Sequence, residues 1–163
     1  MNPDRSRFMT LARTAAFLLV AAMPAAGFAQ SAEEMAQDAL EARHGYMKML
    51  SINMGTLAAM ARGEMEYDEG AATTAATNLA ALTRYDVPSL FVDGTAAGQI
   101  EDSEALPAIW ENPDDFAAKF TQLAEAAAVS PDAVKGGQGN VGPALQQLGG
   151  ACKDCHDDFR QKN

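Results

Sequence analysis

Apolar residues recur at alternating steps of three and four along most of this 163-residue chain, and this spacing limits the possible folds more than any other feature. Residues three and four apart share one face of an α-helix, whereas a half-buried strand needs an apolar residue at every second position. A first helix is predicted from about residue 32 to 62, with core positions Leu40, Met47, Leu50, Met54, Leu57 and Ala61. The pattern predicts an all-α protein.

Proline and glycine divide the remaining chain into three further helical segments. We predict a second helix at about 68–85, a third from Asn112 to about Ser130, and a last one at about 141–161 with Pro143 in its first turn. Their core positions are Ala72, Ala75, Leu79 and Leu82; Phe116, Phe120, Leu123 and Ala127; and Leu145, Leu148, Cys152, Cys155 and Phe159. With one long connection at about 86–107, this order predicts an antiparallel up-down-up-down four-helix bundle.

The first 29 residues are predicted to be a signal peptide, followed by one helical domain over residues 30–163. Three arginines precede an apolar run from Ala15 to Met23, which is too short for a spanning helix of about 20 residues. Small residues then lead to a cleavage position near Ala29. We therefore expect export to the periplasm without a membrane attachment after cleavage; a short membrane anchor is the alternative.

The net charge of the chain limits the classes of macromolecule that the protein is expected to bind. Removal of the leader takes away three of 12 basic and one of 22 acidic residues, which leaves a net charge of −12. Nucleic-acid binding needs a basic patch, so nucleic acid is excluded as an expected partner. An acidic exported protein is better suited to a basic face on a partner protein.

Both cysteines lie in one short motif near the C-terminus, Cys152-Lys153-Asp154-Cys155-His156. This C-x-x-C-H arrangement is the attachment signature of c-type haem. On a helix these residues form one compact patch, in which two thiols bond the haem vinyl groups and the imidazole of His156 reaches the iron. The alternatives are a thioredoxin-like redox pair, which needs an α/β fold, and a zinc site, which needs four ligands.

Arg43 and Met47 are the candidates for the other side of the haem. They lie four residues apart on the buried face of the first helix. A buried arginine needs an anion, and a haem propionate supplies one; a salt bridge to Glu41 or Asp38 is the alternative. Met47 is either an iron ligand or core filling.

Weaker signals come from four other residues. His44 should point to solvent, because it lies about 100° around the helix from Arg43. Arg160, one turn after His156, either binds a propionate or complements the helix dipole. Trp110 and Tyr46 either line the haem pocket or belong to the core.

These residues together resemble the class II cytochromes c, that is, cytochrome c' and its low-spin relatives. The resemblance covers the chain after the leader and is most specific at residues 41–54, 86–91, 108–110, 114–116 and 144–160. It implies one covalent haem c, His156 as the proximal ligand, and Arg43 four residues before a distal residue, here Met47. It also implies a four-helix bundle, which is the fold of cytochrome c'.

The resemblance leaves two functions open. In high-spin cytochromes c' the distal residue does not bind iron, and the five-coordinate haem accepts nitric oxide or carbon monoxide. In low-spin relatives a methionine binds iron and the protein carries electrons to redox partner proteins. We favour electron transfer and expect no enzymatic turnover. A homodimer is also expected, through an apolar strip of Met49, Ile52, Ala59 and Met60 on the first helix.

Overall fold

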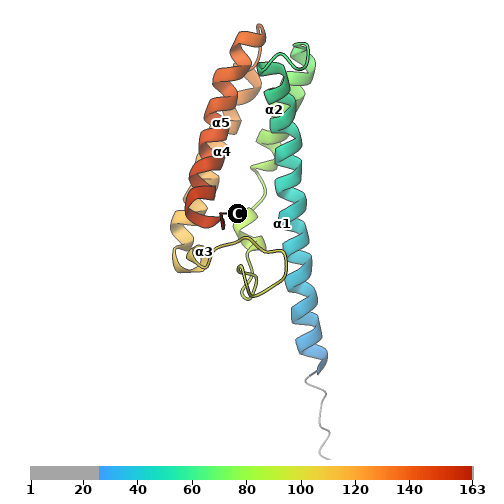
Figure 1. The fold of residues 1–163 in the computed structure, drawn as a ribbon, viewed down its shortest axis with the longest axis vertical. Coiled ribbons are helices and arrows are strands. Elements are labelled where there is room, and N and C mark those ends of the chain that lie inside the picture. The colour runs from blue at the N-terminus through green and yellow to red at the C-terminus, as the bar shows by residue number, and fades with distance from the viewer. Residues whose placement is uncertain (1–25, 163) are drawn as a thin grey trace, which may run out of the picture.

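The computed structural model describes residues 26–162, and every regular element within them is helical. The elements in chain order are α1 (Ala26–Ala61), α2 (Glu69–Leu82), the 3-10 helix η1 (Val87–Leu90), α3 (Ala108–Glu111), α4 (Pro113–Ala133) and α5 (Gln138–Phe159). The four long helices run up, down, up and down (Figure 1). This confirms the predicted all-α fold and the antiparallel four-helix bundle.

The long helices form a closed ring of neighbours in which α1 packs on α2 and α5, and α4 packs on the same two helices. Their lengths differ greatly, since α1 has 36 residues and α2 only 14. At 1.5 Å per residue, α1 is about 54 Å long and α2 about 21 Å. The space beyond the end of α2 is therefore left to η1, α3 and the loops between them.

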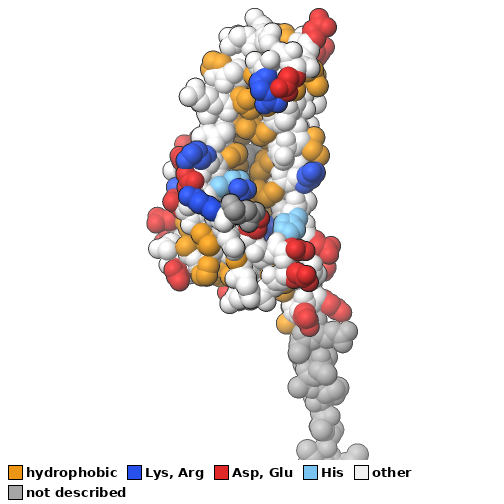
Figure 2. All heavy atoms as spheres, in the orientation of Figure 1, with side chains coloured by type: hydrophobic (Ala, Val, Ile, Leu, Met, Phe, Trp, Pro, Cys, Tyr) orange, Lys and Arg blue, Asp and Glu red, His pale blue; other side chains and the backbone are white. Residues whose placement is uncertain are grey.

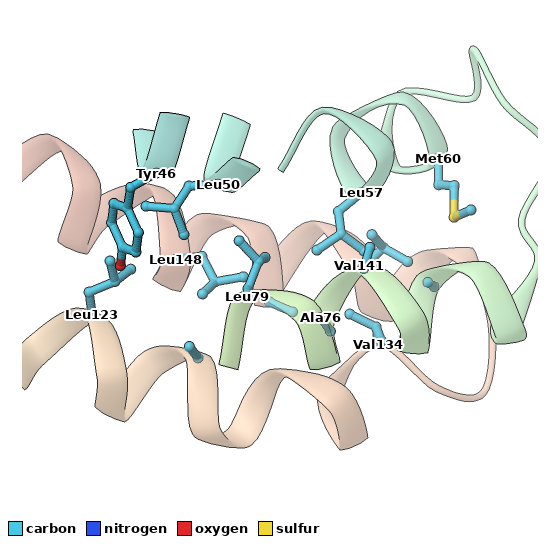
Figure 3. Packing of buried hydrophobic residues seen from close by; sticks show 14 of the residues in the cluster. Tyr46, Leu50, Leu57, Met60, Ala76, Leu79, Leu123, Val134, Val141 and Leu148 are labelled. Atoms are coloured by element: carbon cyan, nitrogen blue, oxygen red, sulfur yellow. The ribbon is translucent and has the colours of Figure 1, made fainter. Parts of the chain in front are cut away.

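The core confirms most of the predicted apolar stripes and adds residues that they omit. Figure 3 shows Leu57, Leu79 and Leu148 interdigitating between the helices, and all three are almost fully buried. The predicted positions Met47, Met54, Phe120 and Leu145 are only partly buried. The further buried residues of this core are Tyr46, Met60, Ala76, Val87, Val134, Val141 and Ala144.

The burial of Met60 contradicts one part of the predicted dimer strip. Its side chain is 0% exposed, so it belongs to the core and offers nothing to a partner. Met60 lies at the end of α1 where the α4–α5 turn covers the helix, and its carbonyl accepts a hydrogen bond of 2.8 Å from Gln138 Nε2. Met49 and Ile52, by contrast, are 47% and 60% exposed.

The third long helix continues through Pro131, contrary to the prediction that it ends near Ser130. A proline inside a helix leaves the carbonyl four residues earlier without its N–H donor. Here that carbonyl belongs to Ala127, and the Ser130 hydroxyl donates to it at 2.8 Å. The preceding serine thus replaces the lost donor, and the last turn forms.

The last helix begins earlier than predicted, at Gln138, so Pro143 lies in its second turn and not in its first. Gly136 and Gly137 precede it with φ of +83° and +133°, conformations that residues with a Cβ rarely adopt. The hydrogen bond from Gln138 to the end of α1 holds the early start in place. The second helix ends at Leu82, three residues before the predicted end, in a turn with i→i−3 bonds.

The connection between α2 and α4 is fastened to the C-terminal end of α5. Leu106 N donates to Phe159 O at 2.9 Å, and Gln161 N donates to Glu104 O at 2.8 Å. Ala105 and Arg160 form an isolated antiparallel bridge between these bonds. The extended backbone of Arg160 ends α5 here, which is why the helix stops before the predicted residue 161.

Most of the predicted signal peptide lies outside the described residues, because these start at residue 26. The cleavage position near Ala29 therefore stays a prediction. None of the helices formed by residues 26–162 has the length and apolar character needed to cross a membrane.

Candidate functional site

A cavity of about 640 Å³ opens between α1, α4 and α5 at the end of the bundle that α2 does not reach. Its lining is mainly apolar, as is usual for cofactor sites of this size. Figure 2 looks onto this region: apolar side chains lie along a hollow in the surface, and cationic and histidine side chains surround its opening. The connection after α2 closes the bottom of the cavity with Phe91, Ala105 and Ile109.

The last two turns of α5 bring Cys152, Cys155 and His156 to one wall of this cavity, and all three side chains are half-buried. Burial raises the pKa of both thiols, that of Cys155 to about 11. Burial, assisted by the positive charge of Arg160, lowers the pKa of His156. The imidazole is therefore neutral near pH 7, which is the form that binds iron.

A second wall of the cavity is α1, which contributes Leu40, Arg43, Met47 and Met54. These residues follow each other at steps of three, four and seven, so one face of the helix carries all of them. The structure thus brings Met47 to the same cavity as the motif on α5.

Arg43 is the clearest sign that the cavity is built for an anionic group. Its side chain is 4% exposed, and its Nη1 is buried without a hydrogen-bond partner. Nη2 donates to the carbonyl of Thr95 at 3.3 Å, and the guanidinium stacks 4.5 Å from the centre of the Phe91 ring. Among the described residues it forms no ion pair with Glu41 or Asp38.

A haem fits these features. Its carboxylates suit the unpaired donor of Arg43, its apolar ring suits the lining, and the thiols and neutral imidazole have the chemistry that attachment and iron binding require. Burial lowers the pKa of Arg43, and an anion beside it removes the cost of that burial.

Two other predicted residues lie at the opening. Arg160 is exposed, lines the cavity and approaches Glu104 with Nε to Oε2 at 3.9 Å. It also follows the last residue of α5, so both predicted uses remain open to it. His44 is exposed, as predicted, and also lines the cavity opening.

Tyr46 and Trp110 do not line the cavity and belong to the core. Trp110 Nε1 donates to Phe91 O at 3.1 Å and so fixes the ring that stacks on Arg43. The hydroxyl of Tyr46 is buried without a partner, and burial together with nearby Cys152 raises its pKa to about 12.

Sequence reasoning missed several lining residues, among them Phe91, Ser103, Glu104 and Lys119. The first three come from the connection, where no periodicity marks which side chains turn inward. Lys119 lies three residues after Phe116 on the apolar face of α4, so its sequence position indicates that its charge is shielded from solvent.

Comparison with known proteins agrees with this geometry. A sequence profile of the family described as Cytochrome C' matches residues 38–160. Cytochrome c' of Cereibacter sphaeroides is 44% identical over 144 residues, which cover 88% of this chain and 94% of that protein. Cytochrome c-554 of the same organism is 46% identical over 147 residues, with 90% and 94% covered.

A solved structure of cytochrome c' from Rhodobacter Spheriodes superposes with a TM-score of 0.75 at 43% identity, covering 78% of this chain and 98% of that one. The family carries one covalently attached haem c. The chain is therefore a haem-binding c-type cytochrome, and it belongs to the cytochrome c' family.

Proposed function

We propose that this protein is a periplasmic electron carrier whose haem is bonded to Cys152 and Cys155 and whose iron is bound by His156. One observation carries the proposal: these three side chains line the same apolar cavity as Met47 and the half-satisfied guanidinium of Arg43. The haem supplies a one-electron iron couple, and the protein supplies its ligands and its surroundings.

Each residue has a separate task in this proposal. His156 presents a neutral imidazole, because its burial disfavours the charged form. Arg43 binds one propionate through its free Nη1 while Nη2 stays on Thr95. Arg160, at the exposed opening, binds a propionate or remains with Glu104. The apolar walls exclude water, which reduces the reorganisation that accompanies electron transfer.

We further propose that Met47 binds the iron in at least one oxidation state. Met47 and His156 line the same cavity from different helices, and the flexible thioether of the methionine is soft enough to bind haem iron. A His/Met ligand pair raises the reduction potential and closes the haem to gases. This makes the protein a carrier of electrons, without turnover of an organic substrate.

The test compares ferrous spectra of the wild type and Met47→Ala before and after addition of carbon monoxide. We expect a low-spin wild type that binds the gas slowly and a high-spin variant that binds it fast. Met54→Ala is the matched control, because Met54 lines the same cavity two turns along α1 and should leave the spectrum low-spin. A wild type that is already high-spin and does not change on substitution of Met47 would overturn the ligand proposal and favour binding of nitric oxide or carbon monoxide.

Export to the periplasm follows, in this proposal, from the leader and from the chemistry of haem attachment. We expect the haem-containing protein in the periplasmic fraction, cleaved near Ala29. Intact-mass measurement of that fraction tests both points, since an uncleaved or cytoplasmic holoprotein would contradict them.

We also propose a homodimer that uses a second hollow, between α1 and α2, lined by the exposed residues Met49, Ile52 and Tyr85. Exposed apolar side chains grouped in this way often mark contacts between proteins. Sedimentation at micromolar concentration should give the mass of a dimer, and Ile52→Lys should give a monomer. A monomeric wild type would contradict this part of the proposal.

A further inference from the structure

Lys119 on α4 forms an ion pair with Asp158 on α5 beside the cavity. Nζ and Oδ2 are 2.8 Å apart, and only 20% of the Lys119 side chain is exposed, against 57% of that of Asp158. The lysines at 135, 153 and 162 also pair with aspartates, but their side chains are 48%, 72% and 75% exposed and their partners lie within five residues along the chain. Lys119 thus carries an unusually shielded charge for a lysine of this protein.

This charge lies at the haem-attachment end of the cavity. Lys119 and Cys155 both line it, from facing helices. The ammonium of Lys119 and the sulfur of Cys155 are close enough to interact electrostatically. The hydrogen bond to Asp158 raises the pKa of Lys119 and keeps it charged at neutral pH.

We propose that the Lys119–Asp158 ion pair tunes the reduction potential of the haem, with Lys119 as a shielded positive charge beside the Cys155 attachment point and Asp158 as its weaker, solvent-screened counter-charge. The inference rests on the proposed haem attachment. It assigns to two residues outside the C-x-x-C-H motif an electrostatic function that is separate from axial ligation.

The sign of each effect follows from charge alone. The oxidised haem carries one more positive charge than the reduced haem. A nearby positive charge therefore destabilises the oxidised form and raises the potential, and a negative charge lowers it. Because solvent screens the exposed carboxylate more than the shielded ammonium, the contribution of Lys119 is larger than that of Asp158.

The experiment is a spectroelectrochemical titration of the holoprotein, Lys119→Met, Asp158→Asn and the double variant. Lys119→Met should lower the equilibrium constant for reduction about three- to tenfold, which for a one-electron couple is a fall of about 30 to 60 mV. Asp158→Asn should raise the potential by a smaller amount. The double variant should lie between the two single variants.

Two controls separate this effect from structural damage. Lys119→Arg keeps the charge and should keep the wild-type potential. Lys135→Met removes a lysine with its own aspartate partner in the α4–α5 turn, away from the cavity, and should leave the equilibrium constant within about twofold of the wild type.

An unchanged reduction potential in Lys119→Met, or shifts of the same sign in both single variants, would overturn the inference. If the ion pair were purely structural, removing either partner would not shift the reduction potential in opposite directions. If Lys119→Met does not hold haem, Asp158→Asn alone tests the inference. A reduction potential of Asp158→Asn that is not higher than that of the wild type overturns it. The proposed function fails separately, if the wild type contains no covalent haem in the first place.

Discussion

The two ends of the bundle are built on different principles. At the end farthest from the cavity, Leu57, Met60, Val134 and Val141 are all 0% exposed and fill the space between the helices (Figure 3). At the other end the same helices hold a cavity of about 640 Å³, and one of its walls includes the buried charge of Arg43. One end is closed by packing and the other is left for a cofactor.

The short second helix produces this difference. Its buried residues include Ala72, Ala75 and Ala76, whose small side chains let α1 and α4 each pack closely on α2. Beyond Leu82 no long helix fills that position, so the helices meet around open space. A bundle can therefore hold a cofactor by ending one helix early, and it need not weaken the core elsewhere.

Aromatic rings give the open end its rigidity in place of aliphatic packing. The Phe116 ring packs edge-to-face on Phe91, Phe120 and Phe159, with ring centres 4.7, 5.2 and 5.1 Å apart. Such pairs contribute about 0.5 to 1.5 kcal/mol each beyond their buried area. They hold the connection and the end of α5 in place around the cavity.

The largest effect should come from replacing both motif cysteines with alanine. The variant should lose all its haem on denaturing acid extraction, because no thioether bond remains. Without the cofactor the open end should also lose stability, since a ligand that binds only the folded state stabilises it. Absorbance of the extracted protein measures the first effect and thermal unfolding the second. Haem that stays attached would contradict the attachment site.

The closed end should respond in the opposite way. Leu57→Ala removes a fully buried side chain and should lower the free energy of unfolding by about 2 to 5 kcal/mol. The haem spectrum of the folded variant should not change, because Leu57 does not line the cavity. Denaturant unfolding and absorbance check the two halves of this prediction. A changed spectrum would show that the two ends are not independent.

The effect of Arg43→Met on the free energy of unfolding should have opposite signs in the holoprotein and the apoprotein. In the holoprotein the substitution removes a charged hydrogen bond to a propionate and should cost about 1 to 3 kcal/mol. In the cysteine-free background it removes a buried guanidinium with an unpaired nitrogen, and stability should stay the same or rise. The exposed Arg84→Met, which lies outside the cavity, is the control, with little change in either background. Equal destabilisation in both would contradict a propionate partner.

The smallest effect should come from the cap of α2. Asp68 accepts a hydrogen bond of 2.6 Å from the backbone N–H of Ala71, and Asp68→Ala should cost about 1 kcal/mol of unfolding free energy. Asp68→Asn keeps an acceptor and should cost less. Urea unfolding of the wild type and the two variants measures this.

The sequence predicts the long helices well because local periodicity records which face is buried. Leu40, Leu50 and Leu148 are buried where their spacing places them. Local patterns failed where a distant segment decides the outcome. The local pattern assigns Met60 to a surface strip, but the α4–α5 turn covers this residue. The pattern also predicts that the third long helix ends before Pro131, but the Ser130 hydroxyl replaces the missing donor and the helix continues.

In the site, the sequence predicts the C-x-x-C-H motif and the position of Arg43, because both lie on helices. It does not predict the partners of Arg43, because the carbonyl of Thr95 and the ring of Phe91 come from the connection between α2 and α4. Thr95 is 0% exposed although it is polar, and its carbonyl also accepts from the Ser103 hydroxyl at 2.7 Å. Irregular backbone carries no periodic signal for such contacts.

The bridge between Ala105 and Arg160 has a consequence for the order of folding. The hairpins α1–α2 and α4–α5 bring together residues close in sequence, whereas the bridge joins residues more than fifty positions apart. Contacts between distant residues pay a larger loop-closure entropy and form later. Pulsed hydrogen exchange should therefore protect the amides of Leu106 and Gln161 after those of the helices. The cavity would then close only after the two helix hairpins have formed.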